Sequence, residues 1–316
     1  MELCLNLKKG FNSDLNSSPL SFGILLQKPS TPPYQDNEIT FKEAAYKPSE
    51  SKRIRDEIVL APYRFDDIED SSALRRGKPT AHRIFGIGQT INSSTYVLIS
   101  SITSAQKLSN KDCVSIVTEE VSNMLRGQSI DLHTTYFSEC PSEAEYLDMI
   151  DNKTGALFRI AYRLMQAESI VPSLPDFEPL LLLLGRYFQI RDDYLNLVSE
   201  EYTGKKGFCE DLDEGKFSFP LIHCLLSPHN PSSSGIAPRL ELQNIFMTRN
   251  RSGHNSLSEE MKHHVLGILN STSSLEYTRL ALDQLDGDLQ SEIARVEMIT
   301  ASENLGLRGL IKKLKI

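Results

Sequence analysis

Apolar residues recur every three or four positions along most of the chain beyond residue 110. In residues 111–137 this spacing lays an apolar stripe along one helix face, formed by Val114, Val117, Val121, Met124 and Leu125. The same spacing continues over residues 145–168, and it returns over residues 259–269 and 273–297. Amphipathic helices are therefore predicted in all of these stretches.

Residues 179–197 show a different pattern. They are apolar on nearly every side until two aspartates near their end, which predicts a helix at the centre of the fold. No stretch gives a convincing alternation of apolar and polar residues between Asn-Gly or Asp-Gly turns, so no sheet is expected. The pattern as a whole predicts an all-α fold.

Polar and proline-rich stretches interrupt the helical pattern. Residues 1–50 are rich in Ser, Asn and Pro and have no sustained periodicity, so they are predicted to be a disordered or loosely ordered leader. Further loops are expected at residues 227–238 and 247–260. A single helical domain is then expected over residues 51–316.

Composition narrows the class of protein. Of the 316 residues, 40% are hydrophobic, which is enough for a sizeable core, and the formal net charge of -8 argues against a nucleic-acid partner. The five cysteines are scattered without CxxC spacing, as is typical of reduced thiols in an intracellular protein. We find neither a secretory signal nor a membrane-spanning apolar run, so a cytoplasmic protein without a membrane span is expected.

The segment RFDDIED concentrates negative charge. On a helix, Asp66 and Asp70 are four residues apart and share one face, with Asp67 close by. Like charges at this spacing repel, so a helix gains no stability from them, whereas Mg²⁺ prefers such hard oxygen ligands. A solvated acidic helix end is the alternative interpretation.

A second acidic cluster favours the metal interpretation. Asp192 and Asp193 end the apolar helix, and Gln189 and Asn196 flank Asp192 on the same face. Carboxylates on a buried helix are costly unless they are paired or bound to metal. Two acidic faces opposite each other across a bundle could hold several Mg²⁺ ions, and such ions would bind a diphosphate.

Basic residues follow each acidic cluster. Arg75 and Arg76 come after the first, and their guanidinium groups suit phosphate oxygens. Lys206 and Lys216 come after the second. Lys153 and Thr154 lie at a polar break before an apolar helix. Each lysine alone reads as a surface charge, but together they are predicted to form a phosphate-binding cage.

At these residues the chain resembles the trans-prenyltransferases (polyprenyl synthases), and especially fungal geranylgeranyl diphosphate synthases. DDIEDSSALRRGKPTAH resembles the first aspartate-rich region of that family, and FQIRDDYLNLVSEEYTGKKGFCEDLDEGKFSFPLIH resembles the second. The motifs GQSIDL and DNKTGALF match the intervening motifs in the expected order. The similarity covers roughly residues 57–310.

The resemblance implies an isoprenoid-synthase-type helical bundle around a central pocket, assembled as a homodimer. It implies about three Mg²⁺ ions per active site, held by Asp66, Asp70 and Asp192 with support from Asp67 and Asp193. It implies that the allylic diphosphate is bound by Arg75, Lys153, Thr154, Gln189, Asn196, Lys206 and Lys216, and that Arg76 reaches isopentenyl diphosphate. The implied reaction is ionisation of the allylic diphosphate, condensation and loss of a proton, giving geranylgeranyl diphosphate without a covalent nucleophile.

The match breaks just before the first aspartates. In the family, a segment of about two helices separates a phrase like VLAPY from the first aspartate motif, whereas here IVLAPYRF runs straight into DDIED. Part of the N-terminal helices, with some isopentenyl-binding cations, is therefore expected to be missing before Asp66. Pro62 also disfavours extending the acidic helix backwards.

Three functions stay open on this basis. The first is an active prenyl diphosphate synthase. The second is a catalytically impaired family member that binds diphosphate or acts as an interaction subunit. The third, a class I terpene cyclase, fits less well, because Asn196 stands where the second metal motif of a cyclase needs Ser or Thr.

Overall fold

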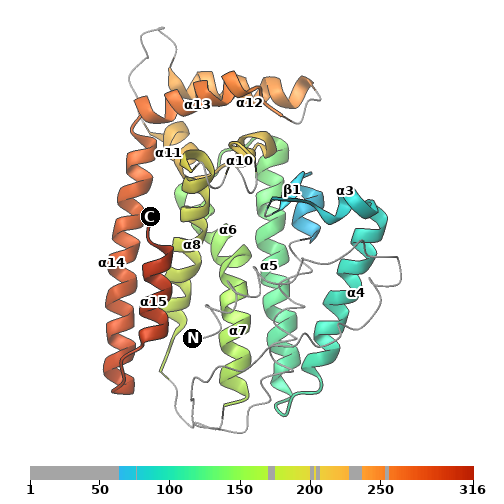
Figure 1. Ribbon diagram of the computed structural model, residues 1–316, viewed down its shortest axis with the longest axis vertical. Coiled ribbons are helices and arrows are strands. Elements are labelled where there is room, and N and C mark those ends of the chain that lie inside the picture. The colour runs from blue at the N-terminus through green and yellow to red at the C-terminus, as the bar shows by residue number, and fades with distance from the viewer. Residues whose placement is uncertain are drawn as a thin grey trace.

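The computed structural model describes residues 64–75, 77–169, 175–199, 203, 207–227, 237–252 and 256–316. Its long elements are all helices, so the predicted all-α fold is confirmed (Figure 1). In chain order they are α3 (Ala81–Phe85), α4 (Ile87–Ala105), α5 (Asp112–Phe137), α6 (Glu143–Lys153), α7 (Gly155–Ala167), α8 (Glu178–Val198), α10 (Glu210–Glu214), α11 (Phe219–Leu226), α12 (Pro238–Ser252), α13 (Glu259–Ser271), α14 (Ser274–Thr300) and α15 (Leu305–Leu314).

The long helix α5 forms where the apolar stripe predicted it. Val117, Val121 and Met124 are buried, and they pack with buried residues of α7 in one core cluster. Leu125 was assigned to the same stripe, but it is 47% exposed. The buried face is therefore narrower than the apolar stripe suggests.

The predicted central helix is α8. Leu180, Leu184 and Ile190 are buried on it, and they pack against residues of α6, α14 and α15 in a second core cluster. Glu178 and Pro179 open the helix, which suits the first turn because a proline there gives up no intrahelical hydrogen bond. Burial on several sides agrees with its almost uniformly apolar sequence.

The stretch predicted as one helical region over residues 145–168 is two helices. α6 starts with a capping box, in which Ser142 and Glu145 satisfy each other's backbone amides. It ends at Lys153, and α7 starts at Gly155, so Thr154 lies at the junction. The polar break recognised in DNKTGALF is therefore a junction between helices.

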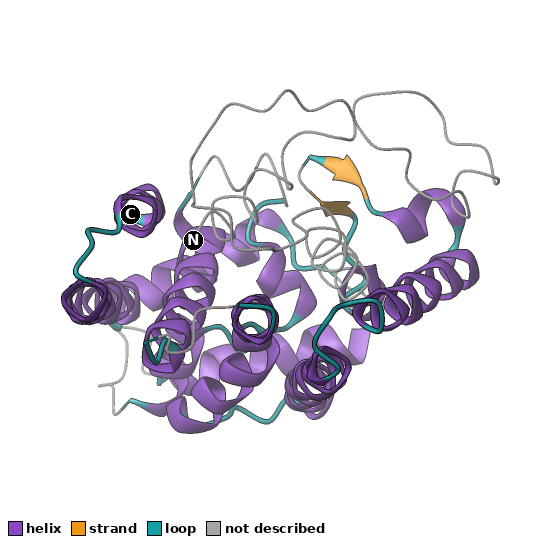
Figure 2. Cartoon of the chain, turned by 90° about the horizontal axis from the view of Figure 1, so that it is seen from below, coloured by secondary structure: helices purple, strands orange, loops and turns teal. Residues whose placement is uncertain are grey.

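A short two-stranded sheet lies before α3. After a helical stretch over residues 64–69, β1 (Leu74–Arg75) and β2 (Lys78–Pro79) pair antiparallel, with Arg75 opposite Lys78. Figure 2 shows this ribbon at the edge of the helical body. Two-residue strands are too short to produce an alternating pattern, which explains why the sequence did not predict them.

Helices α12 and α13 lie across one end of the bundle, next to α10 and α11 (Figure 1). Leu242 and Phe246 of α12 and Val265 of α13 pack on Leu212 of α10 in a third core cluster. The prediction of a loop over residues 247–260 is wrong for residues 247–252, because α12 continues to Ser252. The polar sequence of that last turn carries no apolar periodicity that would have indicated a helix.

Several predictions fall on other parts of the chain. The leader over residues 1–50 and the chain before residue 64, where part of the N-terminal helices is expected to be missing, lie outside the described residues, as does most of the loop at 227–238. No helix in the described ranges combines the length and the hydropathy that a bilayer span requires.

Candidate active site

The first acidic segment is helical, as predicted. Residues 64–69 form the helix, and the amide of Asp70 donates to the carbonyl of Asp66 at 2.8 Å, which places the two side chains one turn apart. Asp67 is buried. Ser71 then takes a left-handed backbone conformation, with φ of 58°, and the helix ends there.

The ribbon after this helix brings Arg75 back onto the acidic segment. Arg75 Nε donates to Asp67 Oδ1 at 2.7 Å, and Arg75 Nη2 contacts Asp66 Oδ2 at 3.2 Å. One predicted phosphate-binding residue thus lies at the predicted metal ligands. Its charge partly neutralises them.

A close contact between backbones places Lys153. A Cβ atom on Gly127 of α5 would lie 2.4 Å from the backbone nitrogen of Lys153, so only glycine allows α6 to approach this closely. Asp131 lies one turn further along the same face of α5. Lys153 Nζ therefore reaches Asp131 Oδ2 at 2.7 Å and Asp66 Oδ1 at 3.2 Å.

A similar contact places Thr154. A Cβ atom on Gly185 of α8 would lie 3.1 Å from the Cα of Gly155, so α7 and α8 approach closely at that point. Gln189 lies one turn further along α8. The hydroxyl of Thr154 donates to Gln189 Oε1 at 2.8 Å. The two predicted diphosphate-binding residues are thus held together.

Asp193 continues this chain of hydrogen bonds into the core. Its carboxylate accepts from Gln189 Nε2 at 3.0 Å, from the hydroxyl of Tyr146 at 2.7 Å and from the amide of Phe219 at 2.9 Å. Burial nevertheless raises the pKa of Asp193 to about 6, against these three donors. Its neighbour Asp192 is only half-buried. The contacts of Asp193 fix α6, α8 and α11 to one another.

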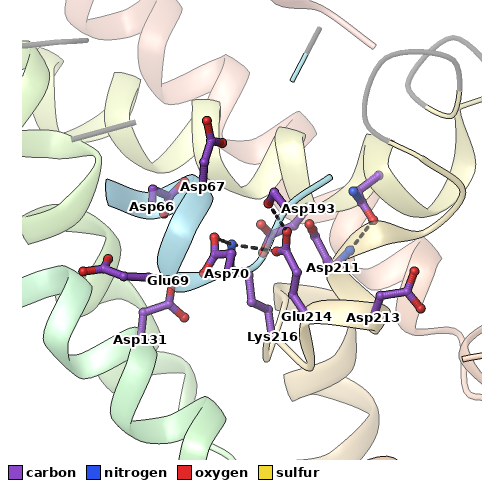
Figure 3. A network of polar contacts seen from close by, with 12 residues as sticks. Asp66, Asp67, Glu69, Asp70, Asp131, Asp193, Asp211, Asp213, Glu214 and Lys216 are labelled. Atoms are coloured by element: carbon purple, nitrogen blue, oxygen red, sulfur yellow. Dashed lines mark hydrogen bonds and ion pairs between the residues drawn. The ribbon is translucent and has the colours of Figure 1, made fainter. Parts of the chain in front are cut away.

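The segment from α10 to Lys216 carries the second basic motif to the first acidic cluster. Lys216 Nζ forms ion pairs with Asp70 and, at 2.8 Å, with Glu214 (Figure 3). Glu214 also accepts a hydrogen bond from Ser72 at 2.8 Å. At the start of the segment, Asn196 Oδ1 of α8 accepts from the amide of Asp211 at 3.3 Å.

The assembled cluster is acidic even after pairing. Five carboxylates (Asp66, Asp67, Asp70, Asp131 and Glu214) surround three cations (Arg75, Lys153 and Lys216). Burial alone would raise the pKa of Asp66, but Lys153, Lys216 and Arg75 together lower it well below its usual range. Burial and the neighbouring carboxylates Asp66 and Glu214 raise the pKa of Asp70, against Lys216. The excess of negative charge suits a divalent cation.

Two carboxylate oxygens in the cluster are available to a hard cation. Asp66 Oδ1 and Glu214 Oε2 are buried and contact lysines, but neither accepts a well-directed hydrogen bond. Within the described ranges, no three carboxylate, imidazole or thiol groups converge as a metal cluster in this ligand-free arrangement. Carboxylate oxygens are ligands that Mg²⁺ prefers, so the residue types of the cluster fit Mg²⁺. Binding of Mg²⁺ stays a prediction.

Most predicted site residues lie in this network, and the structure does not describe two of them. Arg76 and Lys206 fall outside the described residues. Sequence reasoning assigned no role to Asp131, Tyr146 or Glu214. Asp131 and Glu214 belong to the motifs GQSIDL and FCEDLDEGK, so membership of these motifs could have indicated them. Tyr146 belongs to no motif, and the sequence shows only that it lies in an amphipathic helix.

Comparisons with known proteins identify the family of the chain. The family model described as polyprenyl synthetase matches residues 51–245. The chain is 45% identical over 269 residues to ophiobolin F synthase oblA of Cochliobolus heterostrophus, covering 84% of this chain and 37% of that protein. It is also 45% identical over 263 residues to the bifunctional sesterterpene synthase astC of Talaromyces wortmannii, covering 83% and 33% of the two chains.

A third relative is named for a different product. Macrophomene synthase of Macrophomina phaseolina is 45% identical over 251 residues, covering 79% of this chain and 34% of its own. The chain thus spans about a third of the length of the curated relatives it matches. The family match covers both aspartate-rich segments and the residues between them, so the predicted resemblance is confirmed: the chain belongs to the polyprenyl synthetase family.

Proposed function

We propose that this chain is a prenyltransferase that condenses isopentenyl diphosphate with an allylic diphosphate. The observation that carries this proposal is the meeting of three motifs in one cluster. Lys153 of the α6–α7 junction and Lys216 of the second aspartate-rich segment both contact carboxylates of the first. Cations and carboxylates interleaved in this way can bind a diphosphate together with its metal ions.

The side chains of this cluster would bind and orient the allylic diphosphate. Lys153, Lys216 and Arg75 would exchange their carboxylate partners for phosphate oxygens, and the Thr154–Gln189 pair would fix the junction beside them. The carbon–oxygen bond of the allylic diphosphate breaks, with both electrons leaving on the diphosphate. The double bond of isopentenyl diphosphate then attacks the allylic cation, and a proton is lost to form the new double bond.

Mg²⁺ is part of this proposal. Asp66, Asp70 and Asp192 would hold it, and when bound it would stabilise the charge that develops on the departing diphosphate. The three cations of the cluster would act on the same charge, so removing any one should lose transition-state stabilisation, and the three losses should not be additive.

The proposed product has 20 to 25 carbons. The resemblance implied geranylgeranyl diphosphate, which is the C20 product. One relative instead has a name tied to larger terpenes: the astC protein is named a sesterterpene synthase, and sesterterpenes have a C25 skeleton. One further round of the same condensation separates the two products.

The test is an assay of the purified chain with farnesyl diphosphate, labelled isopentenyl diphosphate and Mg²⁺, with product length resolved. We expect a C20 or C25 diphosphate that disappears in Asp192→Ala and on removal of Mg²⁺. Asp286→Asn is the matched control, because Asp286 pairs with the exposed Lys315 at 2.9 Å, outside the cluster described above.

The catalytically impaired family member is the competing outcome. A folded chain that binds inorganic diphosphate with Mg²⁺ but forms no elongated product would contradict the proposed turnover. That result would agree with the expected loss of isopentenyl-binding residues before Asp66. Cyclisation of an allylic diphosphate without isopentenyl diphosphate would instead identify a cyclase.

The chain is further proposed to form a homodimer, as the family resemblance implies. Helix α4 exposes Ile87, Ile91, Tyr96 and Ile99, each at 43% or more. Covering these large apolar side chains with a second copy removes apolar surface from water, which favours association. Sedimentation should show a dimer that dissociates in the double variant Ile91→Lys, Ile99→Lys and persists in Met298→Lys, which changes an exposed residue of α14.

A further inference from the structure

Lys262 is a buried lysine outside the predicted site. It lies on α13 and is 7% exposed, although lysine is rarely buried unless its charge is paired. Its Nζ forms an ion pair with Asp213 Oδ2 at 2.5 Å and donates to the carbonyl of Phe208 at 2.6 Å. Both partners flank or belong to α10, so Lys262 ties α13 to this short helix at its two ends.

Asp213 receives two further contacts from the same side. Its carboxylate accepts the amide of Leu257 at 2.8 Å, and its backbone carbonyl accepts a hydrogen bond from Arg249 of α12. A Cβ atom on Gly215 would lie 2.4 Å from Nη1 of Arg249, so the guanidinium packs directly against this glycine. Helices α12 and α13 therefore hold α10 through its backbone and through one carboxylate.

The held residue is directly next to the cluster. Glu214 follows Asp213, and its carboxylate pairs with Lys216 and accepts from Ser72. Figure 3 shows Asp213 on the side of Glu214 that faces away from Asp70. One side of this short segment thus contacts α13 and the other side contacts the first aspartate-rich segment.

A helix of this length cannot hold its own position. α10 spans Glu210–Glu214, and isolated helices of that length are unstable in water. It begins after Cys209 and ends before Gly215, both in left-handed backbone conformations with φ of 50° and 76°. Tertiary contacts must therefore fix it, and these are the apolar packing of Leu212 and the ion pair of Lys262 with Asp213.

We propose that Lys262 is a positioning residue for the diphosphate-binding segment, acting through Asp213 to hold Glu214 and Lys216 over the first acidic cluster. The match to the family model ends at residue 245, so this residue lies beyond the matched motifs. Its consequence for diphosphate binding rests on the proposed function, whereas its effect on the position of α10 does not.

The first experiment measures the position of α10 without any ligand. The amides of Leu212 and Lys216 donate within the segment, to Cys209 and Asp211, so they report on it by hydrogen exchange. In Lys262→Met we expect their exchange to accelerate about tenfold, with α5 and α8 unchanged. Asp213→Asn should give the same local effect, and the double variant should add nothing.

The matched control is Lys315→Met. Lys315 also pairs with one aspartate, at 2.9 Å, but its side chain is 61% exposed, so its removal should leave exchange in α10 unchanged. Unchanged exchange at Leu212 and Lys216 in Lys262→Met would overturn the proposal. Faster exchange throughout α5 and α8 would also overturn it, because Lys262 would then stabilise the whole fold.

The second experiment measures binding of inorganic diphosphate with Mg²⁺ by calorimetry. Lys262→Met should raise the Kd about tenfold. In the Lys216→Ala background the same change should have no further effect, because residues that act through one contact are not additive. Independent, multiplying losses would overturn the link to Lys216. If the unaltered chain binds no diphosphate, the proposed function fails, and hydrogen exchange still decides the role of Lys262.

Discussion

Two segments bring a lysine to the first aspartate-rich helix, and they are held in different ways. Lys153 lies at the α6–α7 junction, where glycines let the backbones of neighbouring helices come together. Lys216 follows α10, which is held by charged side chains of α12 and α13. The first lysine is placed by close backbone packing, whereas the segment of the second is held by hydrogen bonds and an ion pair in addition to the apolar packing of Leu212.

This difference separates the motifs that carry the chemistry from the residues that position them. At the junction, Gly127 and Gly155 belong to the same motifs as Asp131 and Lys153, so the motifs contain their own supports. At α10, Lys262 comes from a helix that no motif includes. The position of the α10 segment should therefore be sensitive to substitutions of charged residues outside the motifs. The α6–α7 junction should instead be sensitive to substitutions that add side-chain volume at its glycines.

The largest expected effect is that of Gly127→Ala. The new Cβ atom would meet backbone atoms of Lys153 at 2.4 and 2.8 Å, and backbone cannot rotate away as a side chain can. We expect a loss of about 3 kcal/mol in the free energy of unfolding, the upper range for overpacking. Denaturant unfolding checks this value.

Gly267→Ala is the control for that change. Gly267 is exposed in α13, and a Cβ atom there would meet nothing within 4 Å. It should stabilise the chain by about 0.5 to 1 kcal/mol, because alanine favours the helix. Equal effects of the two changes would show that α5 and α6 do not depend on close packing at Gly127.

A smaller effect is expected for Tyr146→Phe. This change removes one of the three donors to the buried carboxylate of Asp193, and it should cost about 1 to 2 kcal/mol of unfolding free energy. The matched control is Tyr277→Phe, because Tyr277 donates to Glu143 at 2.8 Å in an exposed setting. If both changes cost the same, the hydrogen bonds of Asp193 are not what joins α6 to α8.

The smallest effect concerns thiol reactivity. Burial raises the pKa of Cys113 and of Cys209 to about 11, so at pH 8 only about one thiol in a thousand is the reactive thiolate. Both should resist alkylation in the native chain. In Asp213→Asn we expect faster labelling at Cys209 only, as measured by mass spectrometry, because Cys209 precedes α10. Equal acceleration at Cys113 would contradict an α10-specific effect.

Much of the fold was predictable because its helices carry a clear apolar period. α5, α13 and α14 lie where the spacing placed them, and α8 lies where the almost uniformly apolar stretch placed it. The last turn of α12 was missed because its residues are polar, and the ribbon β1–β2 was missed because its strands are too short to show a pattern. Helix propensity and apolar periodicity describe one element at a time. The last turn of α12 and the ribbon β1–β2 depend instead on contacts with neighbouring elements, so these two sequence properties do not indicate them.

The candidate site was predictable in its residue types and less so in its contacts. The motifs indicated Asp66, Asp70, Lys153 and Lys216, but nothing in the spacing showed that the acids and bases would pair with each other. Lys262 could not be found from sequence, because a lysine between Met261 and His263 reads as an exposed residue of an amphipathic helix. Its burial follows from where α10 packs, which is a tertiary contact.

The pairing of acids with bases in the cluster has a thermodynamic consequence. Each lysine that an anion removes from a carboxylate leaves that carboxylate free for a divalent cation, and each cation that binds a carboxylate frees a lysine for an anion. Under the proposed function, the two kinds of ligand are then reciprocal effectors, and each would raise the affinity of the chain for the other by the same factor. With its charges largely paired internally, the cluster would then favour taking up metal and diphosphate together over taking up either alone.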